Sequence, residues 1–268
     1  MKKAVHYVVR IIAALAFIGM IVVNILSDSL PINGVTTGEV SDYYFDLFAP
    51  AGYAFAIWGL IYVLLAAFTL YLLGLFRAKG APVDEPSLTK IAIWFTLSSV
   101  ANVAWLILWH YFMPGLSLLM IVVLLLCLIR ITRIILGMQL SDRERVFVRL
   151  PFNIYYGWIT IANIASVTAW LVSIGFTGFG IPRQIWTVIA LLLGAVIATL
   201  VMFSDRSVSY GLVFMWGYIA IIVRHLSPSE LAAEYPAVVV TAAVCVIWFL
   251  IMVFSVRNAN KRLREEGK

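Results

Sequence analysis

Three long apolar segments of this 268-residue chain carry polar and aromatic side chains at helical spacing. At about 100° per residue, the members of each set fall within roughly an 80° arc of one helix. An amide left alone in hydrocarbon costs several kcal/mol, so we expect these faces to turn inward, toward one another or toward a ligand. An intramembrane pocket is therefore our first functional hypothesis. The three sets are Phe55-Trp58-Tyr62-Thr69, Ser98-Asn102-Trp105-Trp109 and Asn153-Tyr156-Thr160-Asn163.

The chemistry available on these faces is that of binding. Tryptophan and tyrosine walls suit a planar ligand, because offset stacking adds about 0.5–1.5 kcal/mol beyond the burial of area. Asn102 and Asn163 would then be the few polar groups that orient a ligand in an apolar pocket. The alternative is packing of the bundle itself, in which interhelical bonds from asparagine contribute about 1 kcal/mol each. Both interpretations stay open at this point.

Catalytic chemistry has little support in the sequence. Acidic residues are absent from the interiors of the apolar segments, so no carboxylate pair is placed for acid–base catalysis. No cluster of histidine, cysteine and carboxylate residues has the spacing of a metal site. His110 and His225 fall on one side of the membrane as a haem-ligating pair would, but no motif supports ligation, and we favour histidines bonded to water. We therefore predict no catalytic residue and no metal, and leave enzymatic activity undecided.

The composition is that of a polytopic membrane protein. Hydrophobic residues make up 63% of the chain and charged residues 12%, against about 25% charged in soluble domains. The formal net charge of +6 does not indicate nucleic-acid binding, because the basic residues lie in short loops, as orientation signals do. Eight segments are long enough to span a bilayer. They lie near 8–26, 52–76, 90–111, 115–136, 151–174, 185–203, 207–223 and 236–256.

The charge pattern also predicts the orientation. With the N-terminus inside, every basic residue except Arg183 and Arg224 falls on the cytoplasmic side, which places both termini there.

Residues 1–27 could be a signal peptide, but no small-residue cleavage site follows, so we expect the segment to be retained. The longest outer loop, residues 27–50, is acidic and aromatic, and either folds over the bundle as a lid or forms an interfacial belt.

The same segments resemble a known family, the TspO/MBR group of tryptophan-rich sensory proteins, which are related to the translocator protein (peripheral benzodiazepine receptor). In that family's second helix a proline is followed by a tryptophan and a tyrosine, as here at Pro50, Trp58 and Tyr62. The third helix carries Asn-x-x-Trp, matched by Asn102 and Trp105, with Trp109 and His110 at the positions of an aromatic pair. In the fifth helix Pro151 and Asn163 keep the spacing, while Phe152 and Tyr155 replace a tyrosine and a tryptophan and Trp158 lies close by.

The resemblance covers about residues 5–175 and implies a five-helix core, and together with the eight apolar segments it predicts an all-α transmembrane bundle of about eight helices. Residues 1–175 would form a TspO-like five-helix core, residues 176–256 three additional helices, and residues 257–268 a basic cytoplasmic tail. We expect an integral protein of the bacterial cytoplasmic membrane that contacts lipids. We expect no nucleic-acid partner, and small residues such as Gly194 and Ala198 would allow a homo-oligomer.

The resemblance further implies a receptor or sensor that binds a hydrophobic, planar ligand, either a porphyrin or other tetrapyrrole or a sterol-like molecule. Porphyrin or haem would be a ligand, and we predict no resident cofactor. The alternative is a transporter of a lipophilic or amphipathic solute, which a helix broken near the membrane centre would favour. A porphyrin-degrading enzyme is implied by resemblance alone. The expected ligand-binding residues are Trp58, Tyr62, Asn102, Trp105, Trp109, Tyr155, Trp158 and Asn163.

Overall fold

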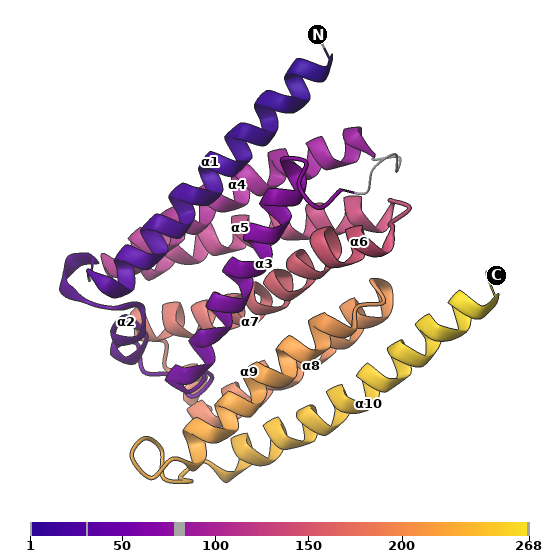
Figure 1. The fold of residues 1–268 in the computed structure, drawn as a ribbon. Coiled ribbons are helices and arrows are strands. Elements are labelled where there is room, and N and C mark those ends of the chain that lie inside the picture. The colour runs from indigo at the N-terminus through magenta and orange to yellow at the C-terminus, as the bar shows by residue number, and fades with distance from the viewer. Residues whose placement is uncertain (1, 31, 78–83, 267–268) are drawn as a thin grey trace. The chain divides into compact units, whose positions relative to one another are not determined.

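The computed structural model describes residues 2–30, 32–77 and 84–266, and their regular secondary structure is entirely helical, without strands (Figure 1). Lys79 and Lys268, which contributed to the predicted charge asymmetry, lie outside the described residues, as does position 267 of the predicted tail. The α-helices are α1 (Lys2–Ser29), α2 (Thr37–Tyr43), α3 (Ile57–Leu72), α4 (Glu85–His110), α5 (Pro114–Leu136), α6 (Asp142–Glu144), α7 (Leu150–Ser173), α8 (Arg183–Ser204), α9 (Val208–Leu226) and α10 (Pro236–Glu266). Short 3₁₀ turns occur at η1 (Ile32–Gly34), η2 (Gly52–Ala56) and η4 (Gly178–Gly180), and η3 (Arg145–Arg149) is a π-helical turn.

The predicted all-α transmembrane bundle is confirmed. A long helix occupies each of the eight predicted segments, and seven helices among the described residues are long and apolar enough to cross a membrane. The exception is α7, which has the length of a span but carries Asn153, Tyr155, Thr160 and Asn163. These polar side chains are acceptable there because nearly every residue in the first half of α7 is buried.

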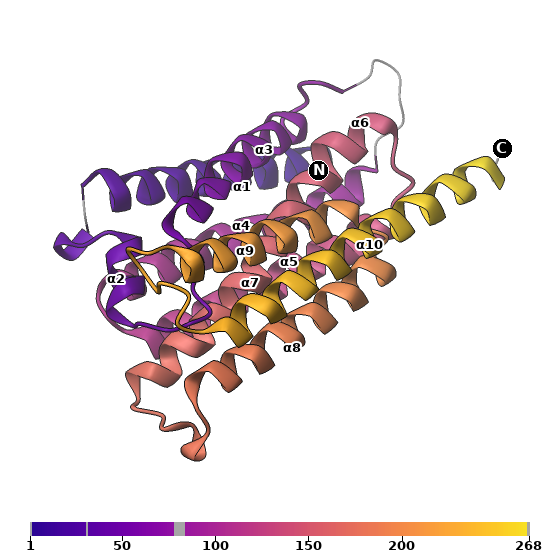
Figure 2. The same cartoon turned by 90° about the horizontal axis from the view of Figure 1, so that it is seen from below.

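The chain divides into two compact units. Unit 1 comprises residues 1–40 and 57–159, and unit 2 comprises residues 41–56 and 160–268, so α7 begins in the first unit and ends in the second. In unit 1, α1 packs against α3 and α4, and α4 packs along α5 (Figures 1 and 2). The predicted division of the chain near residue 175 stays a prediction.

In unit 2, α8, α9 and α10 pack against one another, and η2 contacts α9. Gly194 of α8 allows this close approach, since a Cβ at that position would overlap the hydroxyl of Tyr218. That hydroxyl donates a hydrogen bond of 2.8 Å to the carbonyl oxygen of Leu191. Ala198 is fully buried as well. The small residues predicted to mediate oligomerisation therefore take part in packing within unit 2, and a homo-oligomer stays a prediction.

Candidate functional site

An aromatic cluster lies in unit 1 around Trp58, which stands at the start of α3. The ring of Trp58 stacks on Tyr62 and on Trp105, with centroids 5.5 and 6.0 Å apart. Tyr155 of α7 meets the same indole edge-on at 6.0 Å. Trp105 and Tyr155 are buried, whereas Trp58 and Tyr62 are half-buried. The structure thus brings together four of the predicted ligand-binding residues, from three helices.

A network of buried amides and phenols adjoins the cluster. Asn24 of α1 donates a hydrogen bond of 2.8 Å to Oδ1 of Asn102 in α4, and the hydroxyl of Tyr62 donates one of 2.7 Å to Oδ1 of Asn24. Asn102 in turn donates to the hydroxyl of Tyr155 at 3.3 Å. The predicted inward orientation of Asn102 is confirmed, since its side chain is fully buried. The network joins α1, α3, α4 and α7 at one level of unit 1.

Asn24 was missed by the sequence analysis, although a signal was present. It is an amide inside the apolar segment 8–26, so the energetic argument applied to Asn102 required a buried partner for Asn24 too. Asn24 lacks the repeated helical spacing that marks the other polar faces, because α1 carries only a single polar turn with Asn24 and Ser27. Ser27 is also buried and donates to the carbonyl oxygen of Asn24.

Trp105 carries an unused hydrogen-bond donor. Its indole Nε1 is buried and has no hydrogen-bond partner among the residues that the structure describes. Buried donors of this kind are uncommon, and each requires an explanation such as a water or a ligand. Asn102 already bonds Asn24 and Tyr155, whereas the N–H of Trp105 is a buried donor at the aromatic cluster that a ligand could use.

The other predicted residues lie elsewhere on α4 and α7. Trp109 is buried near the end of α4, where its indole N–H donates to the carbonyl oxygen of Thr37 at 3.2 Å. Trp158 is buried in unit 1, and Asn163 is buried in the part of α7 that belongs to unit 2. Their role in binding stays a prediction.

Both outer histidines are bonded to their own helices. Nδ1 of His110 donates to the carbonyl oxygen of Leu106 at 2.8 Å, and Nδ1 of His225 donates to that of Ile221 at 2.9 Å. Both side chains are fully buried, so they are not the solvated interfacial histidines that we expected.

Among the described residues, no group of three or more histidine, cysteine or acidic side chains could hold a metal ion.

Comparison with known proteins identifies the family. A family model described as TSPO-like protein matches residues 10–255. The chain belongs to this family. The match runs well beyond residue 175 and includes α8, α9 and most of α10, so the TSPO-like region takes in the C-terminal helices as well. Neither the curated proteins nor the solved structures gave a match.

The outer loop of this TSPO-like protein is held on α9 within unit 2. The Nη1 atom of Arg224 donates hydrogen bonds to the carbonyl oxygens of both Asp46 and Ala49, at 3.0 and 3.1 Å. The indole of Trp216 donates to the carbonyl oxygen of Ala54 at 3.0 Å, which fixes the end of the same loop. Arg224 was one of two basic residues that departed from the predicted charge pattern. These bonds satisfy backbone groups of the loop and give Arg224 a structural role, whereas its side of the membrane stays a prediction.

Asp46 closes this loop with a buried carboxylate. Its Oδ1 accepts hydrogen bonds from the backbone N–H groups of Phe48 and Ala49, at 2.7 and 2.8 Å. Burial raises the pKa of the Asp46 carboxyl from 3.8 to about 6, because desolvation penalises the charged form more than these bonds and Arg224 favour it. The closed loop therefore binds a proton more tightly than an opened loop would.

Removing the asparagine pair tests the amide network. We expect Asn24→Leu or Asn102→Leu alone to lower the free energy of unfolding by about 1–3 kcal/mol, because each leaves buried partners unsatisfied. The double variant should lose less than the sum of the two, with a coupling of about 0.5–1.7 kcal/mol. Unfolding in mixed micelles measures both quantities. Asn260→Leu, which removes an exposed hydrogen bond from a half-buried side chain to the carbonyl oxygen of Arg206, is the control and should cost under about 0.5 kcal/mol. Additive losses at positions 24 and 102 would contradict the pairing.

The raised pKa of Asp46 predicts a pH dependence of loop opening. The protonated Asp46 carboxyl contributes about 3 kcal/mol to the stability of the closed loop, because its pKa rises from 3.8 to about 6. This contribution is complete below about pH 4 and is lost as the pH rises through about 6. Amide hydrogen exchange of residues 44–49, corrected for intrinsic rates, should show opening about tenfold more favourable at pH 7.5 than at pH 5. Asp46→Asn should abolish the difference. An equal difference in that variant would show that another group is responsible.

Proposed function

We propose that this TSPO-like protein is a membrane receptor or sensor that binds a hydrophobic, planar ligand at the aromatic cluster of unit 1. The observation that carries the proposal is the combination of stacked rings with an unused donor. Trp58 offers a half-buried aromatic face backed by Trp105 and Tyr155, and Trp105 adds a buried N–H without a protein partner among the described residues. Packing alone accounts for the stacked rings but leaves that N–H unexplained.

The geometry favours a flat ligand that carries a hydrogen-bond acceptor. Conjugated rings gain from stacking on indole and phenol, whereas a saturated ring system gains mainly from burial of area. A tetrapyrrole combines an extended conjugated plane with ring nitrogens and carboxylates as acceptors. We therefore place a porphyrin before a sterol as the ligand class.

Transport of a lipophilic or amphipathic solute remains the second candidate and lacks a supporting observation. A broken helix would favour transport, but α8 and α9 each run without interruption, and the turn between them lies at residues 205–207. Directional flux into proteoliposomes would favour transport, and binding without flux would favour a receptor.

Protoporphyrin IX titration in detergent tests the proposed site. We expect Trp58→Ala combined with Trp105→Ala to weaken binding at least tenfold, because stacking and the indole donor are both lost. Trp248→Ala, which removes an exposed tryptophan of α10, is the control and should bind like the wild type. Absorbance of the porphyrin gives the affinity. Unchanged affinity in the double variant would show that the site is misplaced.

A second arm of this experiment isolates the indole donor. Trp105→Phe keeps an aromatic ring and removes the N–H, so we expect a loss of about fivefold to tenfold for protoporphyrin, equivalent to one hydrogen bond. Pyrene, which is flat and has no acceptor atom, should bind the wild type and this variant alike. Equal losses for both ligands would assign the effect to ring shape instead of the hydrogen bond.

A further inference from the structure

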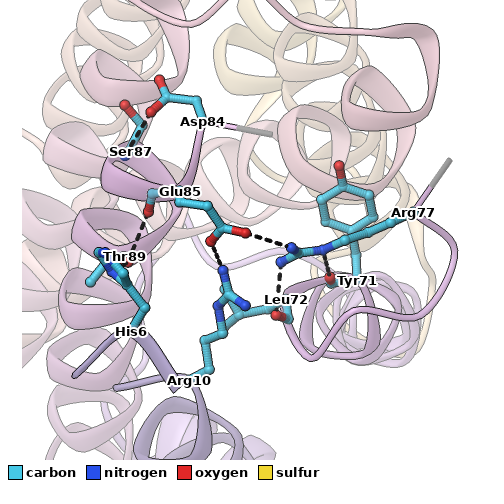
Figure 3. A network of polar contacts seen from close by, with 9 residues as sticks. All are labelled: His6, Arg10, Tyr71, Leu72, Arg77, Asp84, Glu85, Ser87 and Thr89. Carbon is cyan, nitrogen blue, oxygen red and sulfur yellow. Dashed lines mark hydrogen bonds and ion pairs between the residues drawn. The ribbon is translucent and has the colours of Figure 1, made fainter. Parts of the chain in front are cut away.

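A second polar site lies at the opposite end of unit 1 from α2, where the start of α1 meets the end of α3 and the start of α4 (Figure 3). Glu85, the first residue of α4, contacts two guanidinium groups at once. Its Oε2 atom meets Nη2 of Arg10, and its Oε1 atom lies 2.9 Å from Nη1 of Arg77. One carboxylate therefore serves two positive charges.

Arg77 has little capacity for another partner. Its Nε and Nη2 atoms donate to the carbonyl oxygens of Tyr71 and Leu72, both at 3.0 Å, so it caps the end of α3 while Nη1 binds Glu85. A basic side chain that bonds the last carbonyls of a helix also complements the helix dipole. Arg77 thus has a structural role, and it shares the carboxylate of Glu85 with Arg10.

Arg10 is in the opposite situation. Only 13% of its side chain is exposed, yet its Nε is buried without a hydrogen-bond partner in the described part of the chain. A guanidinium has five N–H donors, and the contact of Arg10 with Glu85 uses few of them. Glu85 itself is half-buried, and Glu144, the buried carboxylate among the described residues of unit 1, is already held by the backbone N–H and hydroxyl of Ser141. The positive charge of Arg10 is therefore incompletely matched by the protein.

The position of Arg10 indicates what could match it. It lies two turns into α1, near the start of a span that begins at Val5, and Val5, Tyr7 and Val8 next to it are exposed apolar residues. His6, one turn earlier, bonds Thr89 of α4 at 2.6 Å and so holds this turn of α1 against α4. An arginine at this depth stands where hydrocarbon gives way to lipid headgroups, and guanidinium groups bind phosphate with planar, paired donors.

We propose that Arg10, supported by the Glu85–Arg77 pair, binds a phosphate group, with an anionic phospholipid headgroup as the occupant. Phosphate supplies the acceptor oxygens that Nε and the remaining N–H groups of Arg10 lack. Its negative charge balances the positive charge of Arg10, which Glu85 matches only in part. Glu85 keeps the side chain of Arg10 extended along α4, and Arg77 limits the repulsion between Glu85 and the phosphate.

Native mass spectrometry of the whole protein in detergent tests this proposal. Wild-type protein is titrated with phosphatidylglycerol, with phosphatidylcholine and with inorganic phosphate. We expect phosphatidylglycerol to bind at least fivefold more tightly than phosphatidylcholine. Arg10→Gln should remove this preference, and Arg10→Lys should keep part of it. Arg130→Gln is the matched control, because Arg130 is an exposed arginine of α5 that rests on the ring of Trp94, and it should keep the preference in full.

The arms separate the two sources of phosphate. If inorganic phosphate binds the wild type and competes with the lipid, and Arg10→Gln abolishes its binding, the site recognises phosphate as such and the assignment to Arg10 stands. If the wild type shows neither a preference for phosphatidylglycerol nor binding of phosphate, the proposal is wrong. It is equally wrong if Arg10→Gln retains the wild-type preference. The wild-type comparison decides the outcome even where Arg10→Gln does not fold.

Discussion

The structure of unit 1 depends on one constraint, which is that amides at membrane depth must be paired inside the protein. Asn24 and Asn102 meet this constraint by bonding each other, and Tyr62 and Tyr155 take up their remaining groups. Four helices are thereby held in one register, since sliding any of them by a turn would leave a buried amide or phenol unsatisfied. The positions of Trp58 and Trp105, and with them the candidate binding site, follow from that register.

The same requirement, that polar groups inside the protein be paired, explains the arginines at the ends of the two units. In unit 1, Arg77 satisfies the last carbonyls of α3, and Glu85 links it to Arg10 of α1. In unit 2, Arg224 satisfies carbonyls of the outer loop, with Glu230 3.2 Å from its Nε. Arg77 and Arg224 each donate to two backbone carbonyl oxygens, whereas Arg10 pairs only with the carboxylate of Glu85 among the described residues. Neutral amides thus organise the interior of unit 1, whereas Arg77 and Arg224 satisfy backbone groups at the end of a helix and in a loop.

Much of the fold could be predicted from the sequence, because apolar length and polar faces are local properties. The eight long helices and the inward orientation of Asn102 follow from such patterns. On α7 the helical spacing predicts a face that contains Tyr156, whereas Tyr155 is the residue that bonds Asn102. Spacing predicts a single buried face, but α7 is buried around most of its first half. Tyr155 was named only through the family resemblance.

Interactions between distant segments could not be predicted in this way. The roles of Arg224 and Asp46 depend on the path of the loop backbone, which no periodicity encodes. The pairing of Asn24 with Asn102 likewise requires knowing which helices are neighbours. The polar character of Asn24 was visible in the sequence, but its partner was not.

The most direct test of this account is disulfide formation between α1 and α4 in native membranes. Asn24→Cys and Asn102→Cys are introduced together after Cys127 and Cys245 have been replaced by serine, and mass spectrometry measures the linked peptide after mild oxidation. We predict efficient linkage of positions 24 and 102, and little linkage when the exposed neighbour Ile25 carries the cysteine in place of Asn24. Equal linkage from positions 24 and 25 would show that the two amides do not share a buried interior, and would contradict the account.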